Sequence, residues 1–130
     1  MNNVFTAREV RIRTGLTYRQ IDDLARKGLL GPSIAAAAGK GTRRLYSERD
    51  VVLLRAVAYL RKAGVGRVTF AVAMKFLQTG AITRSTRGRF LVIARGRAQV
   101  MDSAKLVGFL QEPSCLSVVL PLQLLEANAA

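Results

Sequence analysis

A short basic segment carries the side chains of this sequence that are best suited to chemistry. Residues 39–44 read Gly-Lys-Gly-Thr-Arg-Arg, so Lys40, Arg43 and Arg44 stand on or beside a glycine turn. Glycine adopts the backbone angles of a tight turn easily, and such a turn can present its neighbours outward. Ammonium and guanidinium groups presented in this way suit phosphate oxygens. The segment therefore indicates contacts to a phosphate-bearing partner.

The charge of the whole chain points in the same direction. Its 130 residues include 21 basic and 8 acidic side chains, which gives a net charge of +13. Residues 1–67 hold 14 basic and 5 acidic residues, and residues 68–130 hold 7 and 3. An excess of this size favours a polyanion, with nucleic acid as the first candidate and a membrane surface as the second. A simple role in solubility is the plain alternative.

The sequence lacks residues that several functional classes require. The chain has no histidine and one cysteine, Cys115, which precedes an apolar stretch and is expected to be a buried structural thiol. The Gly-Lys-Gly-Thr segment is too short for a phosphate-binding loop of a nucleotide hydrolase. We therefore expect no enzyme activity, no metal and no cofactor. With no apolar run of about 18 residues and no signal peptide, a cytoplasmic, nucleoid-associated protein is expected.

Three segments carry the signature of a helix start. A hydroxyl residue is followed three positions later by a carboxylate or an amide, so that each can cap the backbone of the other. Apolar residues at helical spacing come next and predict helices over residues 7–13, 18–27 and 48–62, with a shorter one over 67–78. The capping pairs are Thr6 with Glu9, Thr17 with Gln20, and Ser47 with Asp50.

The first two helices and the basic segment fit one arrangement. The helices are separated by about three residues that include Gly15, as in a helix-turn-helix. Pro32 prevents the second helix from continuing, and a short strand near Ile34, the glycine turn and a return strand over 43–46 form a hairpin beside it. We interpret residues 1–78 as a winged helix-turn-helix domain, with Tyr46 in the core at the base of the wing.

The second half has a different composition. Residues 79–89 are polar and basic and predict a linker, and residues 90–101 predict two strands around a turn at Arg95 and Gly96. A helix capped by Asp102 or Ser103, an apolar strand over 115–122 and a short tail helix complete a β-β-α-β segment over 90–130. The fold class is thus mainly α with a small β component (α+β). The apolar strand leads us to expect a homodimer through residues 90–125.

Residues 5–78 resemble the DNA-binding domain of MerR-type transcriptional regulators. The shared motifs are the Thr14-Gly15 turn, "KGLL" at the end of the second helix, "RLYSERDV" after the wing, and "LRKAG" at the end of the long helix. The resemblance implies sequence-specific binding of double-stranded DNA, and RNA polymerase is a further expected partner. Two features depart from the family pattern. Asp22 and Asp23 occupy positions where many members carry aromatic or arginine contacts, and the usual long dimer helix is missing.

Two alternative functions remain open at this point. An excisionase-like architectural factor would bend DNA for an integrase without contacting RNA polymerase. An antitoxin-like module would use the β-β-α-β segment to bind a protein partner.

The DNA contacts are expected from the start of the second helix and from the wing. Arg19 could read a guanine, and Tyr18 could contact a phosphate or a thymine methyl group. The plain alternatives are that Thr17 only caps the helix, that Tyr18 packs on the first helix, and that one of the two wing arginines points to solvent or pairs with an acid of the long helix. The expected DNA-binding residues are Thr17, Tyr18, Arg19, Arg26, Lys40, Arg43 and Arg44.

Overall fold

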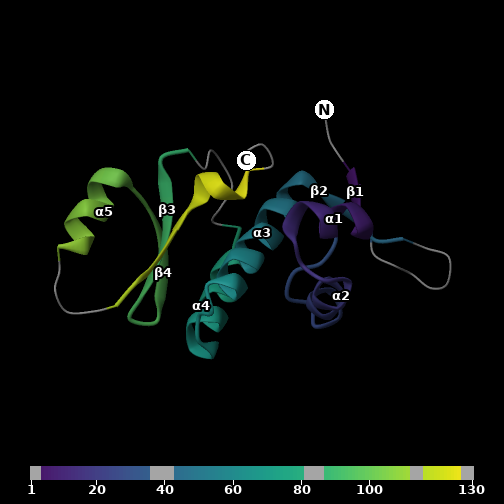
Figure 1. The fold of residues 1–130 in the computed structure, drawn as a ribbon, viewed down its shortest axis with the longest axis horizontal. Coiled ribbons are helices and arrows are strands. Elements are labelled where there is room, and N and C mark those ends of the chain that lie inside the picture. Colours follow the sequence, from purple (N-terminus) through teal and green to yellow (C-terminus); the bar gives the residue numbers. More distant parts are fainter. Residues whose placement is uncertain (1–3, 36–42, 81–86, 112–115, 127–130) are drawn as a thin grey trace. The chain divides into compact units, whose positions relative to one another are not determined.

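The computed structural model describes residues 4–35, 43–80, 87–111 and 116–126. The chain divides into two compact units, Met1–Gly64 and Val65–Ala130. Figure 1 shows the helices and strands of both. Residues 36–42, which include the glycine turn and Lys40, lie outside the described residues, as do Cys115 and the middle of the predicted linker.

The first unit contains three helices and a two-stranded sheet. Each helix begins with the capping box that the sequence predicts, with both hydrogen bonds of the box formed. Gly15 ends the first helix with a left-handed backbone angle (φ 79°), which an L side chain would disfavour. The elements are β1 (Val4–Thr6), α1 (Ala7–Thr14), α2 (Tyr18–Arg26), β2 (Leu45–Ser47) and α3 (Glu48–Lys62).

The wing joins the helices through β2. Leu45 forms a bridge with Ala35, which confirms that the return strand pairs with the segment after Pro32. On its other side β2 pairs with β1, where Phe5 lies opposite Tyr46. This second pairing was not predicted, because three residues at the N-terminus are too few to show a strand pattern. The sheet anchors the base of the wing directly before α3.

A small apolar core holds the first unit together. Tyr46 is fully buried, as predicted, and burial raises the pKa of its phenol. Within the described residues its hydroxyl has no hydrogen-bond partner. The other large, almost fully buried side chains come from all three helices and are Val10, Ile21, Leu24, Leu54, Val57 and Leu60.

The second unit is a three-stranded antiparallel sheet with helices on both sides. The strand order is β4-β3-β5, with β3 (Arg89–Ala94), β4 (Arg97–Asp102) and β5 (Val118–Pro121). Figure 1 shows α5 (Ser103–Leu110) on one side of the sheet and α4 (Arg67–Gln78) on the other. A short 3-10 helix, η1 (Leu122–Leu125), follows β5. The predicted hairpin at Arg95 and Gly96 and the cap at Asp102 are confirmed.

The alternation of side chains along β3 explains why helices cover both sides of the sheet. Val92 belongs to a buried cluster with Met101 and Leu106 on the α5 side. Leu91 and Ile93 point to the opposite side and are also buried. Both faces of the central strand are therefore covered, which explains why its sequence is apolar at successive positions rather than alternating.

The α+β fold class is confirmed, whereas the contacts divide the chain at residues 64 and 65 rather than at residue 78. Helix α4 thus packs with the second unit, although the sequence groups it with the winged domain. In the described residues no helix has the length and apolar character required to cross a membrane.

Candidate nucleic-acid interface

The start of α2 presents two side chains to solvent. Thr17 caps the helix, since its hydroxyl accepts from the backbone N–H of Gln20 at 3.1 Å while the Gln20 amide oxygen accepts from the Thr17 N–H at 2.9 Å. The chain therefore enters the helix in a fixed direction. Arg19 is exposed, and Tyr18 is 56% exposed, so Tyr18 does not have its ring buried against the first helix. Both side chains are available to a partner.

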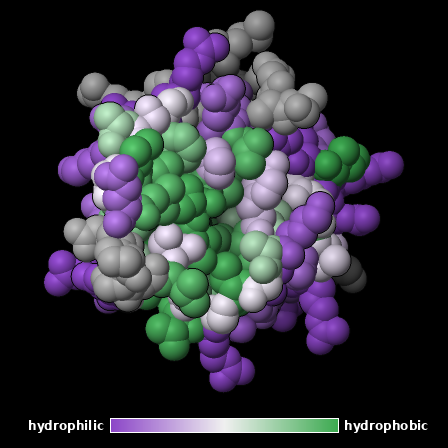
Figure 2. All heavy atoms as spheres, turned by 60° about the vertical axis from the view of Figure 1, so that its left-hand side comes forward, coloured by the Kyte–Doolittle hydropathy of each residue, from purple (hydrophilic) through white to green (hydrophobic). Residues whose placement is uncertain are grey.

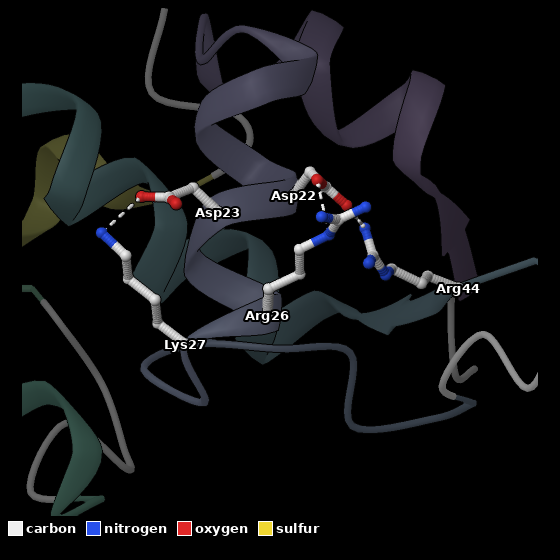
Figure 3. A network of polar contacts seen from close by, with 5 residues as sticks. All are labelled: Asp22, Asp23, Arg26, Lys27 and Arg44. Carbon is white, nitrogen blue, oxygen red and sulfur yellow. Dashed lines mark ion pairs between the residues drawn. The ribbon is translucent and has the colours of Figure 1, made fainter.

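Asp22 joins α2 to the return strand of the wing. One carboxylate oxygen lies 2.8 Å from a terminal guanidinium nitrogen of Arg44, and the other lies 3.0 Å from Nε of Arg26. Figure 3 shows the carboxylate between the two guanidinium groups. Only 18% of the Arg44 side chain and 25% of the Asp22 side chain are exposed, so solvent screens this pair less than a surface pair.

The electrostatics of this group follow from its geometry. The hydrogen bond from Arg44 lowers the pKa of the Asp22 carboxyl, and the charge of Arg26 adds to the effect against partial desolvation. The same hydrogen bond raises the pKa of Arg44. Asp22 is therefore ionised at neutral pH, and its negative charge is matched by two cations. It reduces the local repulsion among the arginines.

Asp23 has a separate partner. Its carboxylate lies 3.1 Å from Nζ of Lys27, one helical turn further along α2. About half of Asp23 and more than half of Lys27 are exposed, and pairs of this kind contribute little to stability. Their effect here is local, because the carboxylate is balanced by a cation on its own helix.

Between α1, α2 and the wing lies a hollow of about 440 Å³. Three of its lining residues, Arg8, Arg43 and Arg44, are cationic, and Asp22 is its single carboxylate among the described residues. Arg8 and Arg43 are exposed, whereas Arg44 is held by Asp22. Thr6, Ala7 and Tyr18 complete the lining. The hollow thus contains two exposed cations, Arg8 and Arg43, and a third, Arg44, that is held in place by its ion pair with Asp22.

Hydrogen bonds at the start of α3 fix the base of the wing. The Asp50 carboxylate accepts from the backbone N–H of Ser33 at 2.9 Å and from its hydroxyl at 2.7 Å, in addition to its capping bond from the Ser47 N–H. One carboxylate therefore caps the helix and holds the segment that leads into the wing. This second use of Asp50 could not be read from the capping motif.

The structure brings together some of the predicted site residues and separates others. Tyr18, Arg43 and Arg44 line the hollow, and Arg8 joins them. Arg19 and Arg26 lie on α2 and do not line the hollow. Thr17 caps the start of α2. Lys40 lies outside the described residues. The pair of Arg44 with Asp22 was not predicted from the sequence, where the only signal was two unexplained acids, Asp22 and Asp23, in the more basic half of the chain.

The described residues offer no other obvious centre of chemistry. Within them, no group of three or more histidine, cysteine, aspartate or glutamate residues could hold a metal ion. Other arginines serve the fold: Arg55 donates from Nε to the Arg13 carbonyl at 2.9 Å, and the Arg13 guanidinium lies 4.6 Å from the Phe5 ring centre.

The pair of Asp22 with Arg44 predicts an acid-dependent loss of stability. A carboxyl whose pKa is lowered by folding contributes stability above its unfolded pKa, near 3.8 here, and loses it as the pH falls through the lower folded value. Asp22→Asn removes this titration. We expect the thermal midpoint of the variant to lie below that of the unmodified protein at pH 7, and the gap to narrow as the pH falls below 3.8.

Asp23→Asn is the matched control, because its pair is more exposed and lies within one helix. It should lower the midpoint at pH 7 by less than Asp22→Asn does. Equal midpoint curves for the unmodified protein and Asp22→Asn from pH 7 to pH 3 would contradict a stabilising role for this pair.

Comparison with known proteins identifies the first part of the chain. Residues 5–77 match the family described as MerR HTH family regulatory protein. Proteins of Mycobacterium bovis and of two Mycobacterium tuberculosis strains, each named an uncharacterized HTH-type transcriptional regulator, are 44% identical over 64 residues. The match covers 49% of this chain and 28% of the length of each relative. With more than half of its residues matched, this chain belongs to the MerR family of helix-turn-helix regulatory proteins.

Proposed function

We propose that this protein binds double-stranded DNA sequence-specifically and acts as a MerR-type transcriptional regulator in the bacterial cytoplasm. The observation that carries the proposal is the hollow between α1, α2 and the wing, where Arg8 and Arg43 are exposed beside the start of α2. A helix start flanked by cations suits the major groove with phosphates on either side. The function is binding rather than catalysis.

The exposed side chains have two distinct roles in this proposal. Arg19, in the first turn of α2, reads a base edge, because its guanidinium can donate two hydrogen bonds to a guanine. Tyr18 and Arg43 contact the backbone on the side of the wing, and Lys40 belongs to the same wing. Contacts of the second kind position the protein and carry no sequence information themselves.

Arg44 and Arg26 contribute differently because Asp22 holds both. Their guanidinium groups retain N–H donors beyond those directed at the carboxylate, so each can still reach a phosphate. Arg44 has the smaller exposed fraction, and its main contribution is to fix the wing against α2. Thr17 acts through the cap that sets the direction of α2.

Substitution of Arg19 should distinguish a contact to a base from a contact to the DNA backbone. Arg19→Ala is expected to lose about 1–3 kcal/mol of binding free energy on the cognate site and much less on random duplex, because only the cognate site presents the guanine. The cognate site is first selected from random duplex with the unmodified protein, and both affinities are then measured by fluorescence anisotropy at one salt concentration.

Arg43→Ala is the matched control and should weaken binding to both duplexes by a similar factor, as expected for a phosphate contact. Arg19 is not a base-reading residue if its removal weakens cognate and random duplex equally.

The assembly of two copies is the second part of the proposal. We infer that residues 1–78 form the DNA-binding part, although α4 packs with the second unit, and that residues 90–125 make a homodimer, after the linker at 79–89. Within the described residues β4 and β5 are the edge strands of the second unit, and the side chain before β5, Leu116, is 97% exposed. Edge strands and exposed apolar side chains favour association. A two-fold dimer would match a palindromic site, and RNA polymerase is a further proposed partner.

Leu116→Glu should weaken this dimer without unfolding the monomer, since the side chain has almost no contacts to lose within its own chain. Sedimentation equilibrium of the unmodified protein should give a dimer at micromolar concentration, and the variant should dissociate at least about tenfold more easily. Ile12→Glu is the control, because Ile12 is also exposed (77%) but lies on α1.

An unmodified protein that stays monomeric at high micromolar concentration would contradict the homodimer. If Leu116→Glu and Ile12→Glu weakened the dimer equally, an added charge at any exposed position would be enough to weaken it. Residues 90–125 would then not be the interface.

A further inference from the structure

The second unit contains a groove that the proposed DNA contacts do not use, within the segment 90–125 proposed to form the dimer. It encloses about 910 Å³ between α5 and the face of the sheet that α5 covers only in part. The eight residues of α5 span about 12 Å, so part of that face remains open. Its lining comes from the β3–β4 hairpin and from one side of α5, and consists of Ala94, Arg95, Arg97, Gln99, Met101, Lys105, Gly108 and Phe109.

The groove combines an apolar floor with cationic walls. Met101 belongs to the buried cluster under α5 and Phe109 packs against it. The positive charge comes from Arg95, Arg97 and Lys105. Among the described lining residues there is no carboxylate. The carboxylate of Asp102, just outside it, accepts from the backbone N–H of Lys105 at 2.9 Å as the cap of α5. Figure 2 shows hydrophobic residues grouped at the centre of the face that includes α5, with hydrophilic residues around them.

Gly108 lines the groove from the side of α5. It lies inside α5, where glycine favours the helix less than alanine does. A Cβ added at this position would meet nothing within 4 Å, and its φ is not in the left-handed region. Neither packing nor backbone conformation therefore requires a glycine here. Its effect is to leave one wall of the groove open.

Arg95, which also lines the groove, has an unusual backbone conformation. In the described residues it is the single non-glycine residue with positive φ (53°), and Gly96 follows with φ 73°. This pair forms the two central residues of a hairpin turn that normally prefers asparagine, aspartate or glycine at the first position. A residue held in a disfavoured conformation at a pocket is a reason to look for function. Here the conformation places a guanidinium-bearing residue at the rim of the groove.

We propose that this groove binds a small organic anion with a flat apolar body, either a carboxylate or a phosphate ester. The volume lies in the range of pockets for small molecules, the floor suits an aromatic or aliphatic body, and the cations suit its charged end. All of the groove's lining residues lie in the second unit, and none of them is among the residues proposed to contact DNA.

The test uses the full-length protein and three matched probes: naphthoate, naphthyl phosphate and neutral naphthamide. Calorimetric titration should give saturable binding of at least one anion and binding at least about tenfold weaker for the amide, since the amide has no charge for the cations. The two anions distinguish a carboxylate ligand from a phosphate ester. Backbone amide shifts in NMR spectra should change around Arg97, Gln99 and Gly108 on saturation.

Two kinds of variant test the site itself. Arg97→Gln with Lys105→Gln should weaken the anion about tenfold, whereas Lys75→Gln, at an exposed position on α4, should leave its affinity unchanged. Gly108→Leu should abolish measurable binding by filling the groove. Gly108→Ala should raise the thermal midpoint, because alanine favours the helix and its Cβ meets open space.

The proposal is overturned by any of three results. These are equal affinity for the anions and the amide, unchanged anion affinity in the Gly108→Leu variant, and shift changes confined to the surface around Arg43. The last result would mean that the anions bind only as general counterions of the basic first unit.

Discussion

The carboxylate of Asp22 lies between the guanidinium groups of Arg26 and Arg44, and this contact ties α2 to the return strand of the wing. A chain with a net charge of +13 cannot gather arginines on one small surface without repulsion. Asp22 reduces that repulsion because its carboxylate pairs with two of the arginines. Its side chain is only 25% exposed, so little of its negative charge faces solvent. The residue that looked least compatible with a polyanion partner therefore has a structural reason to be present. It fixes one element of the interface against another.

Local signals in the sequence predicted the helices and the hairpins well. The capping boxes at Thr6, Thr17 and Ser47 involve residues three positions apart, so their chemistry can be read along the chain. Contacts between distant residues could not be read in this way. The pairing of Phe5 with Tyr46 and the hydrogen bonds from Ser33 to Asp50 depend on how the chain returns on itself, and no local pattern encodes them.

The second unit illustrates the same limit. Its strands follow from the apolar runs around Arg95 and Gly96, but the assignment of α4 to this unit depends on which apolar surface that helix covers. An amphipathic pattern shows that a face is buried without showing the partner that buries it. The groove beside α5 could not be predicted either. It results from a helix that is shorter than the sheet it covers and from a glycine that no neighbouring atom requires.

The central claim is that the basic surface of the first unit binds duplex DNA through several phosphate contacts. The most direct measurement is the affinity for the selected duplex as a function of salt concentration. About 5–8 phosphate contacts predict a slope near −5 to −7 in a plot of log K against log salt, and Arg43→Ala should make it less steep by about one. A slope shallower than about −2, unchanged by Arg43→Ala, would contradict the account.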